Sequence, residues 1–519
     1  MSLPAWPPKT SDAQLAALLN EASTYALAHG FTLLPPHPAS GAPPAPTHAI
    51  AAPLSLFPTP FPRAEYTRAR SIQRLYNALY ARIALDWAFL DGIFEEVAKV
   101  DEFQAELWTR WKAVRDELQR VQKPLQLGIF RSDYLLHASG NESAIKQVEF
   151  NTIASSFGAL SQKAGELHRY LAASGSFFDA APQLADATAY PDNKSLVNIA
   201  AGLADAWKAY GNPKAIVLVV TQDGERNIFD QRALQYELQA THGIKSIRHT
   251  FAELDVLAKH GGDKQTLLIP NPLTPNEAPA EVAVIYYRAA YTPNDYTTGK
   301  EWDTRVFLER SAAIKCPSLA LQLAGAKKVQ QILAEPGQLE EFLLNPARPD
   351  TGFGAGAGTL KQADIDALRE TFTGLWPLDD SPLGKEAQQL AKSHPERFVL
   401  KPQREGGGNN IYRGDIPPYL AKLDAESRPG EAPKREGYIL MELITPPEDV
   451  HNWLVRGGEG KPRLADVVSE LGVYGVSLFG DGKTVVNKEA GTLLRTKGRE
   501  SDEGGVAIGI SSIDSPLLV

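Results

Sequence analysis

Apolar residues recur with helical spacing in the first quarter of the chain. Over 65–86 they fall three or four residues apart, at Ile72, Tyr76, Leu79 and Ile83. Residues at this spacing share one face of a helix, so the pattern predicts an amphipathic helix over 65–86. Helices are predicted in the same way at 11–30 and 103–121. We interpret the apolar stripes as faces that pack against the core.

Shorter apolar runs predict strands in the rest of the chain. They stand at 125–130, 145–153, 215–220, 266–269, 282–287, 397–401, 437–444, 467–479 and 483–491. Further helices are predicted at 161–170, 230–240 and 303–313. Strands and helices alternate within 214–326, which is typical of a largely parallel layered sheet, so we expect an αβ domain there. Asp481 and Gly482 predict a tight hairpin turn between the last two strands.

Two segments interrupt these patterns. The prolines of 35–62 exclude a helix or a central strand, so an ordered extended segment and a surface loop both fit. The glycine-rich segment 347–360 does not satisfy the dinucleotide-binding motif GxGxxG, and no strand precedes it. We interpret 347–360 as a flexible insertion.

Composition narrows the function classes. The chain has 519 residues and a net charge of −9, which disfavours a nucleic-acid partner. A single cysteine, Cys316, excludes an intrachain disulfide, and we interpret it as a small buried hydrophobe. The N-terminus lacks a signal-peptide pattern, and no apolar run is long enough to cross a bilayer. A soluble cytoplasmic protein with no membrane partner is therefore expected.

The segment FVLKPQREGGGNNIY, residues 398–412, is the most informative part of the sequence. An apolar strand ends at Lys401 and leads into three consecutive glycines, whose backbone N–H groups can approach a phosphate closely. Lys401 and Arg404 supply positive charge, and Glu405 suits the Mg²⁺ that accompanies a nucleoside triphosphate. A flexible hairpin loop would explain the glycines alone, but the charged neighbours favour a phosphate loop.

Two other clusters indicate related chemistry. Glu149 and Asn151 lie on one face of a predicted strand, where their oxygens suit a hard cation, although an ordinary polar strand face fits equally well. Arg131 follows an apolar strand and suits a substrate carboxylate, with a surface ion pair as the alternative.

A candidate lid lies near the C-terminus. Arg495 and Lys497 precede the small-residue loop 503–507, which suits a mobile lid over an anionic substrate, with a solvated loop as the alternative. Motifs of P-loop enzymes, zinc peptidases and serine hydrolases are absent from the sequence. The clusters together indicate Mg²⁺–ATP chemistry on a substrate that carries carboxylates.

These segments closely resemble the eukaryotic-type glutathione synthetase family of the ATP-grasp superfamily. The matching segments are RSDY (131–134), VEFNTIASSFG (148–158), ERNIFDQR (225–232), QLAGAKKVQQ (322–331), VLKPQREGGGNN (399–410), ILME (439–442), SELG (469–472), LLRTK (493–497) and GGVA (504–507). The resemblance covers nearly the whole chain. It implies an α/β fold with a circularly permuted ATP-grasp core formed by 1–213 and 327–519. An inserted Rossmann-like substrate-binding domain over 214–326 and mobile lid loops complete the implied architecture. In agreement, the Glu149 and Asn151 strand precedes the Lys401 strand, the reverse of most ATP-grasp enzymes.

The resemblance also implies a reaction. Members of the family join γ-glutamylcysteine to glycine with ATP and Mg²⁺, through an acyl phosphate, giving glutathione, ADP and phosphate. They are generally homodimers, so a homodimer is expected. A related ligase that accepts β-alanine and a catalytically silent ATP-binding scaffold remain as alternatives.

Site residues follow from the resemblance position by position. It implies that Mg²⁺ is held by Glu149, Asn151 and Glu405, and that Arg131, Lys401 and Arg495 are catalytic. The implied ATP contacts are Glu149, Lys327, Lys401, Glu405, Gly406, Gly407, Gly408, Asn409, Asn410, Tyr412, Met441, Glu442, Leu443, Ile444, Glu470, Lys497 and Glu503. The implied substrate contacts are Arg131, Ile153, Ala154, Ser155, Ser156, Glu225, Asn227, Gln231, Arg288, Tyr291, Arg495, Val506 and Ala507. Two positions depart from the family pattern. Ala154 stands where many members have serine, and Glu503 stands where aspartate is common.

Overall fold

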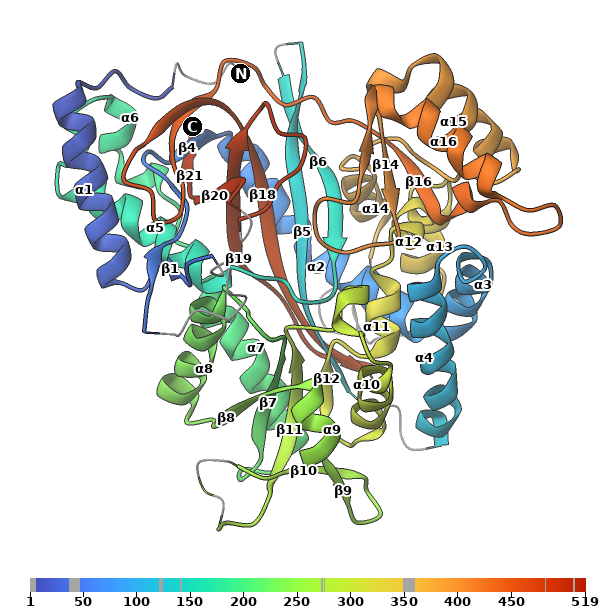
Figure 1. Ribbon diagram of the computed structural model, residues 1–519. Helices are drawn as coiled ribbons and strands as arrows, with labels where there is room; N and C mark the ends of the chain where they lie inside the picture. The colour runs from blue at the N-terminus through green and yellow to red at the C-terminus, as the bar shows by residue number, and fades with distance from the viewer. Residues whose placement is uncertain are drawn as a thin grey trace.

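A sheet of thirteen strands runs through the protein from top to bottom in the view of Figure 1. This computed structural model describes residues 6–36, 47–120, 125–140, 142–271, 274, 276–348, 360–480, 482–506 and 509–519. The predicted insertion 347–360 and the predicted turn residue Asp481 therefore lie largely or wholly outside the described residues. Within the described part, the chain is a mixed α/β protein with several sheets, as predicted.

The upper part of the large sheet is mostly antiparallel. Its strands, in order, are β17 (His451–Val455), β3 (Leu54–Ser55), β20 (Ser511–Asp514), β19 (Lys483–Gly498), β18 (Arg463–Gly480), β5 (Gln126–Ser139) and β6 (Glu142–Asn151). Because β17 also pairs with β18, the first five of these strands form a closed ring. The long strands β5, β18 and β19 lie side by side at the centre of the molecule (Figure 1).

The lower part of the same sheet is parallel, as the alternation of strands and helices predicts. Its strands are β8 (Ser246–Thr250), β7 (Ile216–Thr221), β11 (Ala280–Tyr287) and β12 (Ile314–Cys316), with β10 (Thr266–Ile269) and β9 (Lys259–Gly261) antiparallel at one end. β12 joins the upper part through one register pair, Lys315 opposite Gln126 of β5.

A second, four-stranded antiparallel sheet lies at the upper right of Figure 1. Its strands are β13 (Leu375–Trp376), β16 (Tyr438–Glu442), β14 (Phe398–Pro402) and β15 (Ile411–Tyr412), and α15 (Pro382–Ser393) and α16 (Ile416–Glu426) pack beside it. Two small pairings complete the strands, β1 (Thr32–Leu33) with β2 (Ile50–Ala51), and β4 (Thr59–Phe61) with β21 (Pro516–Leu518). Pro60 in the proline-rich segment thus lies in a two-stranded edge pairing, where its missing N–H is tolerated.

Helices cover both faces of the large sheet. They are α1 (Asp12–Ala28), α2 (Arg63–Leu85), α3 (Trp87–Val97), α4 (Glu102–Arg120), α5 (Gly158–Ala173), α6 (Pro182–Ala185), α7 (Ser195–Tyr210), α8 (Ile228–His242), α9 (Phe251–Leu257), α10 (Lys300–Arg310), α11 (Leu319–Ala324), α12 (Lys327–Leu333), α13 (Gln338–Leu343) and α14 (Gln362–Arg369). No helix of the described ranges is long and apolar enough to cross a membrane.

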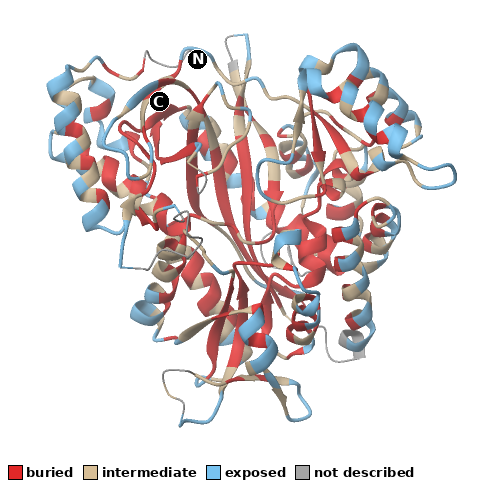
Figure 2. Cartoon of the chain, in the orientation of Figure 1, coloured by how far each residue is buried: buried red, intermediate tan, exposed pale blue. Residues whose placement is uncertain are grey.

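Two hydrophobic cores lie on opposite faces of the sheet. On β7, Leu218 belongs to the core under α2 and α4, whereas its neighbours Val217 and Val219 belong to the core under α5 and α7. Alternate residues of a strand point to opposite faces, so this strand is covered on both sides. The predicted apolar stripe of α2 is buried, as expected, and Figure 2 shows the same burial along the central strands.

The strand β12 carries two buried groups. Cys316 is 2% exposed and belongs to the hydrophobic core under α5 and α7, and burial raises the pKa of its thiol, which confirms its interpretation as a small hydrophobe. Lys315 is 3% exposed, and its ammonium donates to the Ser311 carbonyl. Burial lowers the pKa of Lys315 to about 8, against the attraction of Glu309.

Lys315 predicts a pH-dependent stability. Between pH about 8 and 10.4 the native ammonium loses its proton while an unfolded lysine keeps it, so the unfolded state binds more protons and stability rises with pH. Lys315→Met removes this penalty, and we expect it to raise the free energy of unfolding at neutral pH by up to about 3 kcal/mol. Urea denaturation near pH 7 and near pH 9.5 should show the advantage of Lys315→Met shrinking at the higher pH. An equal advantage at both pH values would contradict the assignment.

Candidate active site

The sheet register places the predicted site residues on neighbouring strands. β5 lies between β6 and β18, so that Arg131 pairs with Asn151 on one side and Tyr474 on the other. Across β18 and β19, Glu470 pairs with Arg495. Residues that are far apart in sequence therefore meet on one face of the sheet, as the hydrogen bonds below show.

Two glutamates meet around one lysine. The ammonium of Lys327, at the start of α12, lies 2.9 Å from the Glu149 carboxylate of β6 and 3.6 Å from that of Glu405 in the β14–β15 loop. Lys401 of β14 donates to the Val148 carbonyl at 2.8 Å. β14 and the loop that follows it are therefore held against β6.

Burial and charge tune these groups. Burial alone would raise the pKa of Glu149, but Lys327 and Lys401 hold it well below its usual range. Burial raises the pKa of Glu405 to about 7, against the attraction of Lys327, and lowers the pKa of Lys401 to about 8. Strongly shifted groups that face each other in this way are typical of functional sites.

A second cluster surrounds Asp133. Arg131 donates to its carboxylate through Nε at 2.6 Å and Nη2 at 2.7 Å, and Arg495 donates through Nη2 at 3.0 Å. Arg495 also contacts Glu470, and Asn151 donates its amide nitrogen to Asp133 at 3.0 Å. The resemblance implies no role for Asp133, but its place two residues after Arg131 on a strand puts both on one face.

The predicted dipeptide contacts form a third group, after β6 and at the parallel strands. Arg288, which follows β11, donates to the Ser155 carbonyl at 3.0 Å and the Ser156 hydroxyl at 2.5 Å. Tyr474 of β18 donates to the Ser156 carbonyl at 2.6 Å. Because Tyr474 also pairs with Arg131, this group adjoins the Asp133 cluster.

Other predicted dipeptide contacts lie on α8 and beside it. Gln231 of α8 donates to Glu225 at 2.9 Å and accepts from Arg248 at 2.6 Å, so both ends of its amide are fixed. Asn227 precedes α8 and donates through its backbone N–H to Glu225 at 2.7 Å. Arg248 was not predicted as a site residue. The remaining two predicted contacts in this region are Tyr291, half-buried after β11, and Ile153, buried in the core after β6.

The turn that carries the serines is strained and anchored. Ala154 has φ +53° and Phe157 has φ +71°, both in the left-handed region that side chains disfavour. Asp230 of α8, another residue that was not predicted, accepts from the backbone N–H groups of Phe157, Ala159 and Leu160 at 2.9–3.1 Å. Asp230 thus holds the start of α5 and the turn before it.

The glycine loop contacts the predicted lid. Gly406 and Gly408 have φ +83° and +88°, which glycine adopts without strain. The Gly408 N–H donates to the Glu503 carboxylate at 3.0 Å, and a Cβ on Gly407 would lie 2.8 Å from the Gly504 carbonyl oxygen.

Other lid residues lie around this contact. Lys497 donates to the Asp502 carbonyl at 2.5 Å, and Asn410 donates to the Tyr412 hydroxyl at 3.2 Å. Asn409 is exposed, and its amide nitrogen lies 3.4 Å from the Gly407 carbonyl oxygen. The side chain of Val506 is buried in a core, and Ala507 lies outside the described residues.

The predicted adenine segment begins on β16, an interior strand of the smaller sheet. Met441 of β16 pairs with a strand on each side, β13 and β14. The Glu442 N–H donates to the Gly374 carbonyl, and the Leu443 N–H donates to the Arg397 carbonyl. Partly buried Leu443, Ile444 and Tyr412 pack against the small buried cluster that contains Met441, and together they form an apolar patch. Such a patch suits the flat face of a base.

One predicted cation points elsewhere. Arg404, proposed from the sequence as a phosphate contact, forms an ion pair with Asp101, and its guanidinium lies 5.8 Å from the Phe103 ring centroid. This pairing engages Arg404 with the N-terminal end of α4, and the predicted phosphate contact of Arg404 stays a prediction.

The residues present fit Mg²⁺. No group of three or more His, Cys, Asp and Glu side chains suited to a metal ion occurs in the part of the chain that the structure describes. Mg²⁺ in phosphate-transfer sites needs only one or two carboxylates beside phosphate and water. Among contacts between described residues, Asn151 Oδ1 accepts no hydrogen bond, so its oxygen remains available beside the Glu149 carboxylate.

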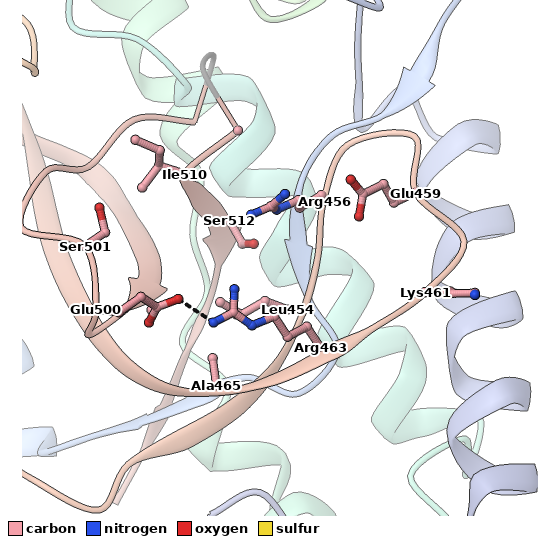
Figure 3. Close-up of a pocket in the computed structure, with 12 residues that line it drawn as sticks. Leu454, Arg456, Glu459, Lys461, Arg463, Ala465, Glu500, Ser501, Ile510 and Ser512 are labelled. Carbon is pink, nitrogen blue, oxygen red and sulfur yellow. Dashed lines mark hydrogen bonds and ion pairs between the residues drawn. The ribbon is translucent and has the colours of Figure 1, made fainter.

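One cavity lies away from these residues. It measures about 620 Å³ and opens between β17, β18 and the ends of β19 and β20 (Figure 3). Gly498 and Ala465 line it, and strand alternation places them on the face opposite Lys497 and Glu470. Its cations, among them Arg463 in an ion pair with Glu500, are exposed, so we interpret it as a surface basin.

Comparisons with known proteins agree on one family. The family profile described as "Eukaryotic glutathione synthase, ATP binding domain" matches residues 12–518. The human glutathione synthetase is 38% identical over 507 residues, covering 98% of this chain and 97% of the human one. The "Glutathione synthetase large chain" of Schizosaccharomyces pombe is 38% identical over 485 residues, covering 89% of this chain and 90% of its own.

A solved structure extends the likeness to the fold. A glutathione synthetase-like effector from Globodera pallida superposes with a TM-score of 0.73 and covers 98% of each chain at 22% identity. At that identity the likeness shows the fold alone. The match over nearly the whole sequence and the curated relatives show that this chain belongs to the eukaryotic glutathione synthetase family and is an ATP-dependent ligase.

Proposed function

We propose that the chain joins γ-glutamylcysteine to glycine with ATP and Mg²⁺, and that the residues above perform the reaction. The observation that carries the proposal is a continuous set of contacts through β6. Glu149 of β6 contacts Lys327, and Asn151, two residues later, contacts Asp133 between the two arginines. Nucleotide phosphates on one side and a substrate carboxylate on the other would meet across this strand.

The nucleotide would lie between the two sheets. Lys327 and Lys401 would hold the phosphates, the glycine loop would offer N–H groups, and the patch around Met441 would receive the adenine. Glu149, Asn151 and Glu405 would hold Mg²⁺, which when bound neutralises phosphate charge and keeps the γ-phosphate in line.

The dipeptide would lie along the arginines. Ser155, Ser156 and Arg288 suit its γ-glutamyl end, together with Gln231 and Glu225. This leaves its terminal carboxylate near Arg131 and Arg495. Val506 and Ala507 keep their predicted place near the glycine end.

The chemistry then needs no enzyme nucleophile. An oxygen of the dipeptide carboxylate attacks the γ-phosphorus, the bond to the ADP oxygen breaks, and an acyl phosphate forms. The glycine amine attacks the acyl carbon, and the tetrahedral intermediate expels phosphate, which takes up the proton that the amine loses. Arg131 and Arg495 would neutralise the developing oxyanion charge, so catalysis would come from positioning and electrostatics.

The lids would close over this intermediate. The contact between Gly408 and Glu503 supports a closed arrangement of the two loops. Glu503, which stands where the family commonly has an aspartate, makes this contact through its carboxylate. Ala154 lacks the usual hydroxyl, but its neighbours Ser155 and Ser156 retain theirs.

The finer architecture is part of the proposal. We propose a circularly permuted ATP-grasp core formed by 1–213 and 327–519, with 214–326 as an inserted substrate-binding domain. The single register pair between β12 and β5 supports the insertion, because the parallel strands otherwise pair among themselves. The homodimer and the cytosolic location stay predictions.

A two-substrate assay tests the reaction. We expect ATP- and Mg²⁺-dependent phosphate release only when γ-glutamylcysteine and glycine are both present, with a clear preference for glycine over β-alanine. The measurement is released phosphate with each substrate omitted in turn. Preference for β-alanine would assign a homoglutathione-type ligase, and ATP binding without turnover would assign a silent scaffold; either result would contradict the proposed reaction.

A further inference from the structure

Asp133 is fully buried, at 0% exposure, and connects three of the strands that build the site. Its Oδ1 accepts from Arg131 Nε at 2.6 Å. Its Oδ2 accepts from Arg131 Nη2 at 2.7 Å, from Arg495 Nη2 at 3.0 Å and from Asn151 Nδ2 at 3.0 Å. One carboxylate thus holds residues of β5, β6 and β19.

The contact fixes which edge of each arginine is free. Arg131 gives Nε and Nη2 to Asp133, and among hydrogen bonds between described residues its Nη1 takes no part. The Nε–Nη2 edge of Arg131 is therefore bound to Asp133, and Nη1 together with the second N–H of Nη2 remains for the substrate carboxylate that the sequence suggested. Arg495, which Asp133 and Glu470 both contact through Nη2, likewise keeps Nε and Nη1 for a ligand.

The same carboxylate fixes the Asn151 amide. Its nitrogen faces Asp133 Oδ2 at 3.0 Å and the Arg131 carbonyl at 3.2 Å. Both partners are acceptors, so the amide oxygen cannot take that position without two repulsive contacts. Since nitrogen and oxygen leave the same carbon in different directions, Asn151 Oδ1 must turn away from Asp133. Oδ1 is the atom that would ligate Mg²⁺.

A glycine opposite Asp133 makes room for this arrangement. Gly472 of β18 pairs with Asp133, and a Cβ built on Gly472 would lie 2.8 Å from Arg131 Cδ and 2.9 Å from Asp133 Oδ1. Any side chain there would displace the ion pair. The missing side chain of Gly472 therefore leaves the space that the Arg131–Asp133 ion pair occupies.

We propose that Asp133 is a positioning residue that sets the substrate arginines and the metal-ligating face of Asn151 together. The proposal rests on the proposed function of those residues. A single buried acid then couples two sites, because a shift of its carboxylate moves both the metal ligand and the anion-binding edges. Hydrogen-bonding partners behind metal ligands commonly change metal affinity by about 10- to 100-fold when removed.

Asp133→Asn tests the proposal with little change in shape. The new amide nitrogen can donate to Asn151 Oδ1, so the Asn151 amide is free to turn over. We expect Mn²⁺, used as a paramagnetic probe with a non-hydrolysable ATP analogue, to bind about 10-fold or more weakly by electron paramagnetic resonance. The KM for γ-glutamylcysteine should rise by a similar factor.

Asp514→Asn is the matched control. Asp514 is similarly buried, at 1% exposure, and its carboxylate accepts hydrogen bonds from Thr59 and Thr496. Thr496 follows Arg495 on β19, so the two side chains point to opposite faces of the sheet and Asp514 lies on the face away from Arg495. The control should change thermal stability without changing Mn²⁺ affinity or the dipeptide KM. Equal effects of the two substitutions on Mn²⁺ affinity would overturn the positioning role, as would wild-type values in Asp133→Asn.

Gly472→Ala keeps the inference testable if Asp133→Asn does not fold. This variant leaves every charge in place and displaces the pair sterically, so weaker Mn²⁺ binding cannot come from lost charge. A folded Gly472→Ala protein with wild-type Mn²⁺ affinity and dipeptide KM would overturn the proposal. Mn²⁺ binding separates this inference from the reaction itself: no wild-type turnover would refute the proposed function, whereas unchanged binding would refute only the role of Asp133.

Discussion

Replacing Glu405 with alanine is expected to abolish most turnover and leave the fold nearly unchanged. Glu405 would hold Mg²⁺ beside Glu149, and losing a metal ligand removes charge neutralisation at the transferring phosphate. A loss of about 3 kcal/mol or more in transition-state stabilisation corresponds to at least a hundredfold lower kcat. Phosphate release with both substrates measures this loss.

The fold should tolerate the change because Glu405 is a costly group in the unliganded protein. Burial raises its pKa to about 7 even though Lys327 lies 3.6 Å away. After the substitution Lys327 keeps Glu149 at 2.9 Å, so no buried charge is left alone. We expect the free energy of unfolding to change by less than about 1 kcal/mol.

Glu426→Ala is a suitable control, because Glu426 ends α16, which packs beside the same four-stranded sheet. Its side chain is 43% exposed and pairs with Lys434 at the surface, so neither activity nor stability should change measurably. Wild-type turnover in Glu405→Ala would remove Glu405 from the metal site. A collapse of its stability would show that it has a structural role instead.

Asp230→Ala is expected to produce the largest loss of stability. The carboxylate is 2% exposed and accepts from three backbone N–H groups at the start of α5 and from Asn227. Each buried donor left without a partner costs about 1–3 kcal/mol. We expect the free energy of unfolding to fall by at least about 3 kcal/mol, measured by urea denaturation.

The same substitution should weaken dipeptide binding in the protein that remains folded. Ser155 and Ser156 stand in the turn that Asp230 anchors, so loosening this turn raises the KM for γ-glutamylcysteine more than it lowers kcat. Asp230→Asn keeps one acceptor oxygen and should fall between wild type and alanine. An Asp230→Ala protein within about 1 kcal/mol of wild type would contradict the anchoring role.

Long, regular elements were predictable from the sequence. The helix predicted over 65–86 is α2, whose apolar stripe is long enough to identify its buried face. The adjoining α3 was not predicted, because it begins at Trp87 directly after Asp86. Asp86 caps it by accepting from the Phe89 N–H at 3.0 Å, a break of one residue that periodicity does not reveal.

Local signals also identified much of the candidate site. Glu149 and Asn151 share a strand face, and Lys401 and Glu405 both precede the three glycines, so a few neighbouring residues were enough to suggest their chemistry. The sequence did not reveal that Arg404 donates to Asp101, which is 303 residues away along the chain. A charge beside a motif does not determine where its side chain points.

The sequence by itself determined the family, the reaction class and the residue types of the site. Only the tertiary structure decided that Lys327 joins Glu149 across 178 residues and that Arg495 joins Asp133 across 362. It likewise decided that the fork of Arg131 faces Asp133 and that Asp230 holds α5. The physical reason is that such contacts depend on strand register and helix packing, which are set by the whole core and leave no periodic trace in the neighbouring sequence.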